Sequence, residues 1–216
     1  IAGLCLVDRA DPGEFLRSFA GTHRFVVDYL VDEVLLRQSE EVREFLLQTS
    51  ILQRMTASLC DAVTGRSDGQ ETLERLDRSN MLLVPLDDRR EWYRYHQLFA
   101  DVLRANAVRQ RGAEVSLWHA RASRWYETHG QRTTAISHAF ASGDFDLAAD
   151  LVERTWPELY YGVRPMTWLG WAEQIPESVA NLRPVLTAAR AWMLLDKGDL
   201  DSAEEHLRMA ERLLSG

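Results

Sequence analysis

Apolar side chains recur every three to four residues through most of the sequence, which is the spacing of one buried helix face. Ser39 and Thr56 stand where a hydroxyl that caps a helix start is expected, and Gly21 and Gly65 stand where helices end. In the first part of the chain this pattern predicts helices over about residues 11–21, 23–38, 39–50, 56–65 and 70–79.

Between residues 81 and 96 the period changes from helical to alternating. The segment MLLVPL alternates Leu82, Val84 and Leu86, a polar turn follows, and WYRYH is aromatic and favours a strand. Pro85 suits an edge strand, and the helical period returns from His96 onward. Helices, a two-stranded hairpin and a further helix are the order of elements in a winged helix.

A single signature recurs in the second half of the chain, where only helical periodicity is found. A glycine is followed five residues later by an alanine three times, as Gly130 with Ala135, Gly143 with Ala148 and Gly198 with Ala203. In two of these, an aspartate after the glycine can cap the next helix, while the alanine permits close packing. The signature predicts TPR-like α-helical repeats, the first units of a solenoid.

These patterns give a fold class and a domain division. We expect a mainly α protein, in which a winged-helix domain with a small β-hairpin is followed by TPR-like α-helical repeats. The predicted limits are residues 22–111 for the winged helix and 112–216 for the first repeats, and residues 1–21 precede them.

Net charge and hydropathy argue against two classes of partner, nucleic acid and membrane. A formal net charge of −8 argues against a broad phosphate-binding surface. The helix before the wing mixes acidic and basic side chains, so we expect it to pack against protein rather than to read DNA.

No apolar run is long enough to cross a bilayer, and the first residues do not form a secretory signal. We expect a cytoplasmic protein that extends upstream of Ile1, with Cys5 and Cys60 as reduced buried thiols.

Motifs of catalysis and metal binding are weak. Residues 65–69 fit the GxSxG pattern of hydrolases, but helical patterns on both sides indicate a polar helix-to-helix loop rather than a nucleophile elbow around Ser67. The six histidines show no metal-binding spacing. Lys197 is followed by Gly198 rather than by Ser or Thr, so no Walker A loop is present. We predict no catalytic residue and no metal ligand.

Two features remain open from the residue pattern. His96 stands where the wing ends and a helix begins, so it could either face an anionic ligand from a neighbouring domain or close the corner by a hydrogen bond. Of these, the pattern favours the hydrogen bond. An aromatic group is expected to form inter-helix core, with a ligand surface as the alternative: Trp156, Tyr160, Tyr161, Trp168 and Trp171.

Several segments carry a family resemblance: HRFVVDYLVDEVL, VREFLLQTSIL, the run ending in YRYHQLF, and the repeats around RWYETHG and AISHAFASGDFDLAADL. They resemble the MalT-like branch of LuxR-family transcriptional regulators, which are signal-transduction ATPases of the STAND class. In that family a P-loop ATPase domain, a helical domain, a winged helix, a superhelical repeat sensor and a DNA-binding domain follow one another. The resemblance implies an internal fragment in which residues 1–21 are the end of the helical linker domain and the last residues lie early in the sensor.

The segment YHQLFADVL is similar to the Met-His-Asp-type segment in the winged helix of related nucleotide switches. This resemblance makes His96 the cofactor-binding residue, which senses the ADP β-phosphate and helps to hold a closed resting state. Tyr95 and Gln97 depart from the pattern, so only the histidine role is carried over. No cofactor is expected to be bound by this chain alone, and ADP or ATP would occupy the parent protein.

The resemblance also implies a function and partners. The chain would be a regulatory fragment of an ATP-dependent transcriptional activator that couples nucleotide state to inducer sensing. Its partners would be an upstream ATPase domain, an unknown inducer on the repeats and further copies of the active parent, with DNA bound only through a C-terminal domain outside this chain and no membrane contact. The alternative is a free-standing helical-repeat scaffold for protein interaction, and a hydrolase using Ser67 ranks third.

Overall fold

The computed structural model describes residues 34–35, 37–79, 81–160 and 165–215. Within it the chain forms two compact units, Ile1–Gly112 and Ala113–Gly216, each with its own buried side chains. The predicted helix over 11–21, most of the one over 23–38, and Cys5 lie outside the described residues. The domain limits 1–21, 22–111 and 112–216 stay predictions.

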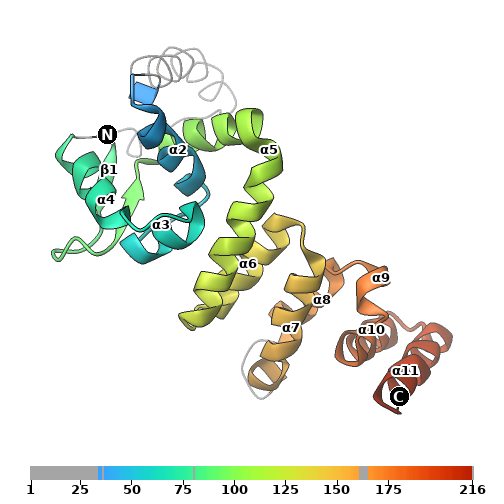
Figure 1. The fold of residues 1–216 in the computed structure, drawn as a ribbon. Helices are drawn as coiled ribbons and strands as arrows, with labels where there is room; N and C mark the ends of the chain where they lie inside the picture. Colours follow the sequence, from blue (N-terminus) through green and yellow to red (C-terminus); the bar gives the residue numbers. More distant parts are fainter. Residues whose placement is uncertain (1–33, 36, 80, 161–164, 216) are drawn as a thin grey trace, which may run out of the picture. The chain divides into compact units, whose positions relative to one another are not determined.

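Among the described residues, the first unit begins with helices α2 (Glu40–Thr49), α3 (Ala57–Thr64) and α4 (Gly69–Arg78), shown in Figure 1. The predicted caps of α2 and α3 are confirmed, because Oγ of Ser39 and Oγ1 of Thr56 each accept a hydrogen bond from a backbone N–H three residues later. Gly65 ends α3 with φ of 76°, a left-handed conformation that glycine adopts without strain.

The core of the first unit lies among these helices and the wing. Helix α2 packs on α3, α3 on α4, and α4 on the first strand. Each helix contributes one apolar face, as the spacing predicts, and burial of that face supplies most of the helix stability. Side chains that are fully or almost fully buried include Phe45, Leu46, Leu59, Leu73 and Leu76.

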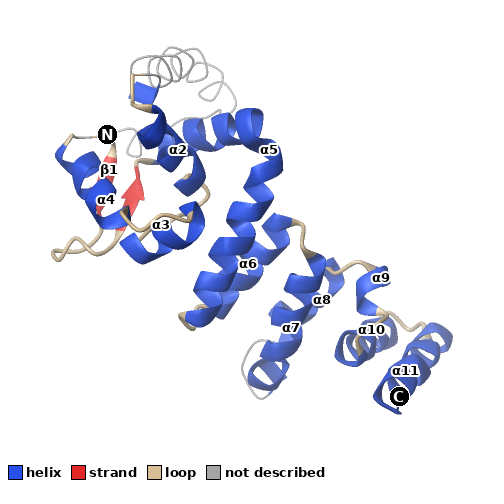
Figure 2. Cartoon of the chain, viewed as in Figure 1, coloured by secondary structure: helices blue, strands red, loops and turns tan. Residues whose placement is uncertain are grey.

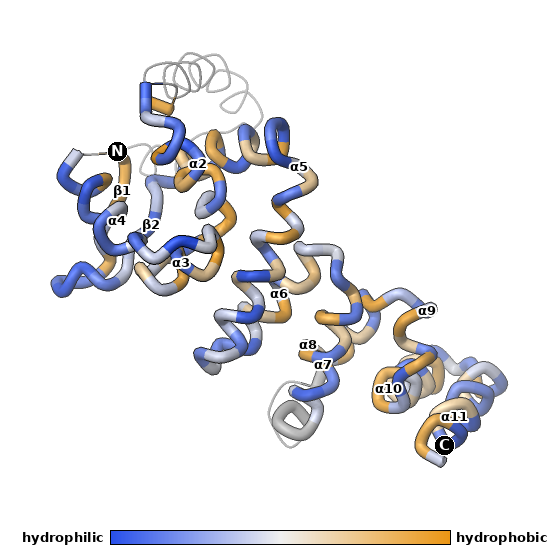
Figure 3. Tube along the Cα trace, in the orientation of Figure 1, coloured by the Kyte–Doolittle hydropathy of each residue, from blue (hydrophilic) through white to orange (hydrophobic). Residues whose placement is uncertain are grey.

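The predicted hairpin is present as strands β1 (Leu83–Pro85) and β2 (Tyr93–Tyr95), which pair antiparallel (Figure 2). The connecting loop is hydrophilic, as Figure 3 shows. The Asp87 carboxylate closes this loop by accepting the N–H groups of Glu91 and Trp92, at 3.1 and 2.7 Å. Helices with a small hairpin therefore confirm the mainly α fold class.

The buried face of β1 is shifted by one residue from the predicted alternation. Met81 and Leu83 are buried, whereas Leu86, which the pattern had grouped with Leu82 and Val84, is 41% exposed. The cause is local backbone geometry, since Leu82 has φ of 54° and so interrupts the extended conformation. A side chain in this left-handed region carries strain, which the surrounding contacts must offset.

Helix α5 (Gln97–Thr128) runs from the first unit into the second. Its backbone leaves helical geometry at Arg111, with φ of −136° and ψ of 30°. The first half buries Phe99, Val102 and Leu103 in the first unit, as the helical period from His96 predicts. Beyond the break, the Trp118 and Tyr126 side chains are buried in the second unit.

The second unit contains, after α5, helices α6 (Arg132–Ser142), α7 (Phe145–Tyr160), α8 (Pro165–Gln174), α9 (Glu177–Ala180), α10 (Pro184–Asp196) and α11 (Leu200–Ser215). Consecutive long helices pair, α6 with α7, α7 with α8 and α10 with α11, and α8 also contacts α10. The second unit is therefore built of helices that pack against their neighbours in the chain.

The glycine and alanine signature has the predicted structural role. The three glycines have φ between 72° and 79°, and the three alanines are fully buried. The two aspartates cap the following helices, since Oδ1 of Asp144 and Oδ1 of Asp199 accept the N–H groups of Leu147 and Ser202. Each repeat of the signature thus combines a glycine that ends one helix with a buried alanine that lets the next helix pack closely.

Part of the aromatic group forms core. The Trp168 side chain is buried, its ring lies 4.7 Å from that of Trp156, and its Nε1 donates to the Val152 carbonyl at 2.8 Å. The expected core use is thus confirmed for Trp168, while Trp156 and Trp171 are half-buried. The side chains of Tyr160 and Tyr161 lie outside the described residues.

Candidate functional site

The wing strand β2 determines which way His96 faces. Successive side chains of a strand point to opposite sides. Tyr93 and Tyr95 are buried, so Arg94 and then His96 lie exposed on the other side. His96 follows β2 directly and precedes the first residue of α5. Alternation in the strand therefore places its imidazole at the surface.

Two contacts hold Tyr95, and with it the end of β2. Its ring meets the ring of Phe99 edge to face, with centroids 5.8 Å apart, and its hydroxyl lies 2.7 Å from Oγ1 of Thr49. Because Thr49 donates its own hydroxyl proton to the Phe45 carbonyl, the Tyr95 O–H is the donor toward Thr49. Burial raises the pKa of Tyr95 above its ordinary value, so the phenol stays neutral.

The corner at His96 is closed by the backbone. Its N–H donates to the Leu82 carbonyl at 2.7 Å, and its own carbonyl accepts the N–H of Ala100 to begin α5. The described residues offer the imidazole no hydrogen-bond partner. A hydrogen bond at His96 therefore closes the corner, as the favoured interpretation has it, and the main chain supplies this bond.

Groups near this corner suit an anion. The first N–H groups of a helix lack intrahelical acceptors, and the helix dipole places partial positive charge there. His96 stands next to these groups at the start of α5 with its ring exposed. The strained Leu82 lies directly across the backbone bond from His96. Strain of this kind is concentrated at functional sites in proteins.

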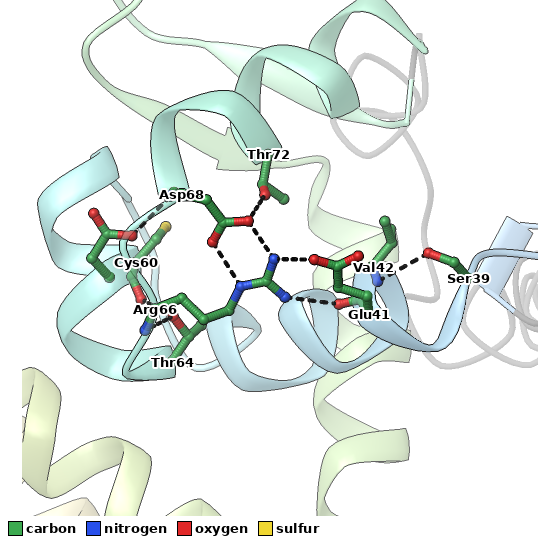
Figure 4. A network of polar contacts seen from close by, with 10 residues as sticks. Ser39, Glu41, Val42, Cys60, Thr64, Arg66, Asp68 and Thr72 are labelled. Atoms are coloured by element: carbon green, nitrogen blue, oxygen red, sulfur yellow. Dashed lines mark hydrogen bonds and ion pairs between the residues drawn. The ribbon is translucent and has the colours of Figure 1, made fainter.

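The GxSxG loop is a polar clamp between helices rather than a nucleophile elbow. Figure 4 shows the Arg66 guanidinium between two carboxylates, with its Nε 2.7 Å from Oδ1 of Asp68 and its Nη2 2.6 Å from Oε1 of Glu41. Arg66 lowers the pKa of the Asp68 carboxyl, chiefly through this hydrogen bond. Ser67 is exposed and bonds to no histidine among the described residues.

The second glycine of this motif is required by close packing. The Gly69 N–H donates to Oδ1 of Asp61 at 2.8 Å, which caps the start of α4. A Cβ at Gly69 would lie 2.7 Å from both the Ala57 carbonyl oxygen and Oδ1 of Asp61. The motif therefore serves the junction of α3 and α4.

A histidine pair that the sequence did not reveal lies in the second unit. Nδ1 of His119 is 2.9 Å from Nδ1 of His138, and the ring of Tyr126 stacks on His138. One imidazole must donate and the other accept, so the pair has complementary tautomers. Burial, and then the field of His119, lower the pKa of His138 to about 4. Burial also lowers the pKa of His119.

The described residues hold neither a metal-binding cluster nor a membrane-spanning helix. In the part of the chain that the structure describes, no group of three or more His, Cys, Asp and Glu side chains could hold a metal ion. Over the same residues, no helix is long and apolar enough to span a membrane. Burial holds the pKa of the Cys60 thiol above its ordinary value, so this thiol is unreactive.

The helices, wing and following helix define a winged-helix domain, and comparison with known proteins gives its family. Residues 31–115 match the model of the MalT winged helix domain. The chain is 34% identical over 205 residues to the HTH-type transcriptional regulator MalT of Klebsiella pneumoniae subsp. pneumoniae. This match covers 92% of this chain and 22% of that protein. The chain belongs to the MalT-like family.

Other relatives show the same partial coverage. The MalT regulator of Cronobacter sakazakii is 32% identical over 88% of this chain and 21% of its own length. The serine/threonine-protein kinase PknK of Mycobacterium tuberculosis is 33% identical over 89% of this chain and 17% of its own length. The chain thus spans about a fifth of the length of the curated relatives that it matches.

Replacing Gly69 by alanine should destabilise the first unit. The added Cβ meets the Ala57 backbone oxygen, which moves only with α3, so we expect a loss of about 1–3 kcal/mol in the free energy of unfolding. Urea denaturation measures this loss. Ser67→Ala is the matched control and should change stability by less than about 0.5 kcal/mol. Equal stability of the two variants would show that the packing at Gly69 is loose.

The histidine pair predicts a pH-dependent stability of the second unit. The folded-state pKa of His138, about 4, lies below the unfolded value of about 6.5, so the unfolded state binds more protons between these pH values. Stability from this group is complete above pH 6.5 and is lost as pH falls to 4, by up to about 3 kcal/mol.

Thermal unfolding of the chain and of His138→Leu, followed from pH 7 to pH 4, measures this contribution. The difference in stability between the two proteins should shrink as the pH falls. His129→Gln, at an exposed histidine, should keep the profile of the unchanged chain. A difference that stays constant over this range would mean that His138 is not held neutral by the fold.

Proposed function

We propose that the chain is the regulatory segment of an ATP-dependent, MalT-like transcriptional activator in the cytoplasm, and that it couples nucleotide state to inducer sensing. In this proposal an upstream ATPase domain binds ADP or ATP, the helices of the second unit belong to a TPR-like sensor, and a separate domain binds DNA. Two observations support this assignment: the chain belongs to the MalT-like family, and it matches about a fifth of the length of its relatives.

The observation that carries the proposal is the exposed His96 ring at the start of α5. Its backbone is fixed by the bond to Leu82, so the side chain projects from a defined point on the surface, and its ring nitrogens have no partner among the described residues. A phosphate oxygen of ADP is the acceptor that this ring and the first N–H groups of α5 would take. His96 would then stabilise the ADP-bound resting state.

The regulatory step follows from linkage. A nucleotide or an inducer shifts a conformational equilibrium only by its difference in affinity for the two states. A contact from His96 that is made only in the resting state gives ADP such a difference. Loss of this contact would favour the open form that assembles with further copies.

Exposed apolar side chains on the last helices support a continuing repeat sensor. A following helical repeat would bury such a surface, as neighbours in a solenoid do. The same surface fits the alternative of a protein-interaction scaffold, in which another protein would cover it. The side chains are between 44% and 74% exposed: Trp192 and Leu195 on α10, and Leu200, Leu207 and Leu214 on α11.

Replacing His96 by alanine in the longer protein that contains the ATPase domain should weaken ADP retention about 10- to 100-fold. This range corresponds to the loss of one hydrogen bond to a charged group. The ADP that remains bound after gel filtration, together with basal transcription, measures the effect. Basal activity should rise as ADP is lost.

His129→Ala removes an equally exposed histidine from the second unit and is the matched control. It should retain ADP as the unchanged protein does. If His96→Ala also retains ADP and keeps basal activity low, the assigned role of His96 is incorrect. If neither the parent nor the variants bind nucleotide, the scaffold function replaces the regulatory one.

A further inference from the structure

A groove in the second unit is lined by charged, polar and apolar side chains. It has a volume of about 350 Å³, within the range of small-molecule pockets. Its floor is one face of α10 and the residue after it, because Arg190, Met193, Leu194 and Lys197 recur at helical spacing. The sides are Glu173 at the end of α8, Glu177 in α9, and Ser202 and His206 in α11.

Arg190 is the most constrained polar group of this groove. Its side chain is only 15% exposed, and its Nη2 donates to the Ile175 carbonyl at 2.6 Å while Nη1 pairs with Glu177 at 3.2 Å. Its buried Nε has no acceptor among the described residues. Because this Nε is closed to solvent, a ligand oxygen would be bound through Nη1 and Nη2, each of which carries two hydrogens and makes one hydrogen bond to the described residues.

The second cation of the groove, Lys197, makes only a weak, exposed ion pair. Nζ of Lys197 lies 3.7 Å from Oε1 of Glu173, and both side chains are about two-thirds exposed. Such exposed pairs contribute little to stability. A ligand carboxylate can therefore take the lysine, and a ligand ammonium can take the glutamate, at small cost.

His206 adds an acceptor. Its Nδ1 lies 2.9 Å from the Ser202 carbonyl, and because a carbonyl only accepts, Nδ1 carries the proton. In this tautomer Nε2 of the groove-lining His206 is an acceptor. The two cations of the groove, Arg190 and Lys197, balance its two carboxylates, Glu173 and Glu177. An anion would therefore be repelled by the carboxylates and a cation by the basic side chains. A ligand that carries both charges can place each one next to its opposite.

We propose that this groove binds a small zwitterion of the amino-acid class with an apolar side chain. The ligand carboxylate contacts Arg190 and Lys197, and its ammonium contacts Glu173, Glu177 and Nε2 of His206. Its apolar side chain lies on Met193 and Leu194, where the flexible thioether adapts to its shape. The inference rests on the proposed function in one respect, since it gives the sensor its class of ligand.

Isothermal titration of the purified chain with L-leucine and L-methionine tests this proposal. Two probes separate the charges: 4-methylpentanoate lacks the ammonium of leucine, and 3-methylbutylamine lacks its carboxylate. We expect at least one amino acid to bind at least about tenfold tighter than either single-charge probe. Equal binding of one single-charge probe, or no binding of either amino acid at about 10 mM, would overturn the proposal.

Variants locate the site. Lys197→Ala and Glu173→Gln, both at exposed positions, should each weaken binding at least about tenfold, and Arg190→Lys should do the same if it folds. Arg208→Ala removes an exposed cation of α11 outside the groove and should bind normally. Unchanged binding in both exposed groove variants would contradict the assignment. These titrations need no nucleotide, so their failure is distinguishable from failure of the role of His96.

Discussion

Burial of the Tyr95 side chain is the constraint on which the winged helix and its candidate site depend. The hydroxyl donates to Thr49 of α2, and the ring packs on Phe99 of α5, so one side chain joins the strand to helices on both sides of it in the sequence. Since a strand alternates its faces, fixing Tyr95 inward fixes His96 outward. The main-chain bond from His96 to Leu82 then sets where α5 begins. The exposed histidine is therefore a consequence of the core.

Much of this fold could be predicted from residue patterns because its determinants are local. Ser39, Thr56 and Gly65 set helix ends through bonds within a few residues, and they do so in the structure as the sequence indicates. The face of β1 was predicted wrongly because Leu82 has a left-handed backbone conformation, which interrupts the extended alternation. No pattern of apolar and polar residues encodes such a φ value.

The candidate sites also combine features that local sequence indicates with features that depend on tertiary packing. His96 was singled out by its position between wing and helix, but its exposure follows from burial of Tyr95, which the sequence alone does not establish. The pair of His119 and His138 joins α5 to α6 across 19 residues, and neither histidine has a distinctive neighbour in the sequence. The groove around Arg190 is assembled from four helices, so its residues meet only through packing.

The central claim is that the corner between β2 and α5 presents His96 to a bound nucleotide. The most direct test is a structure of the longer parent protein with ADP, determined by crystallography or electron cryomicroscopy. We expect an imidazole nitrogen of His96 at about 2.7–3.2 Å from a β-phosphate oxygen. An ADP molecule bound with His96 more than about 6 Å from every phosphate oxygen, and with no water between them, would contradict the account.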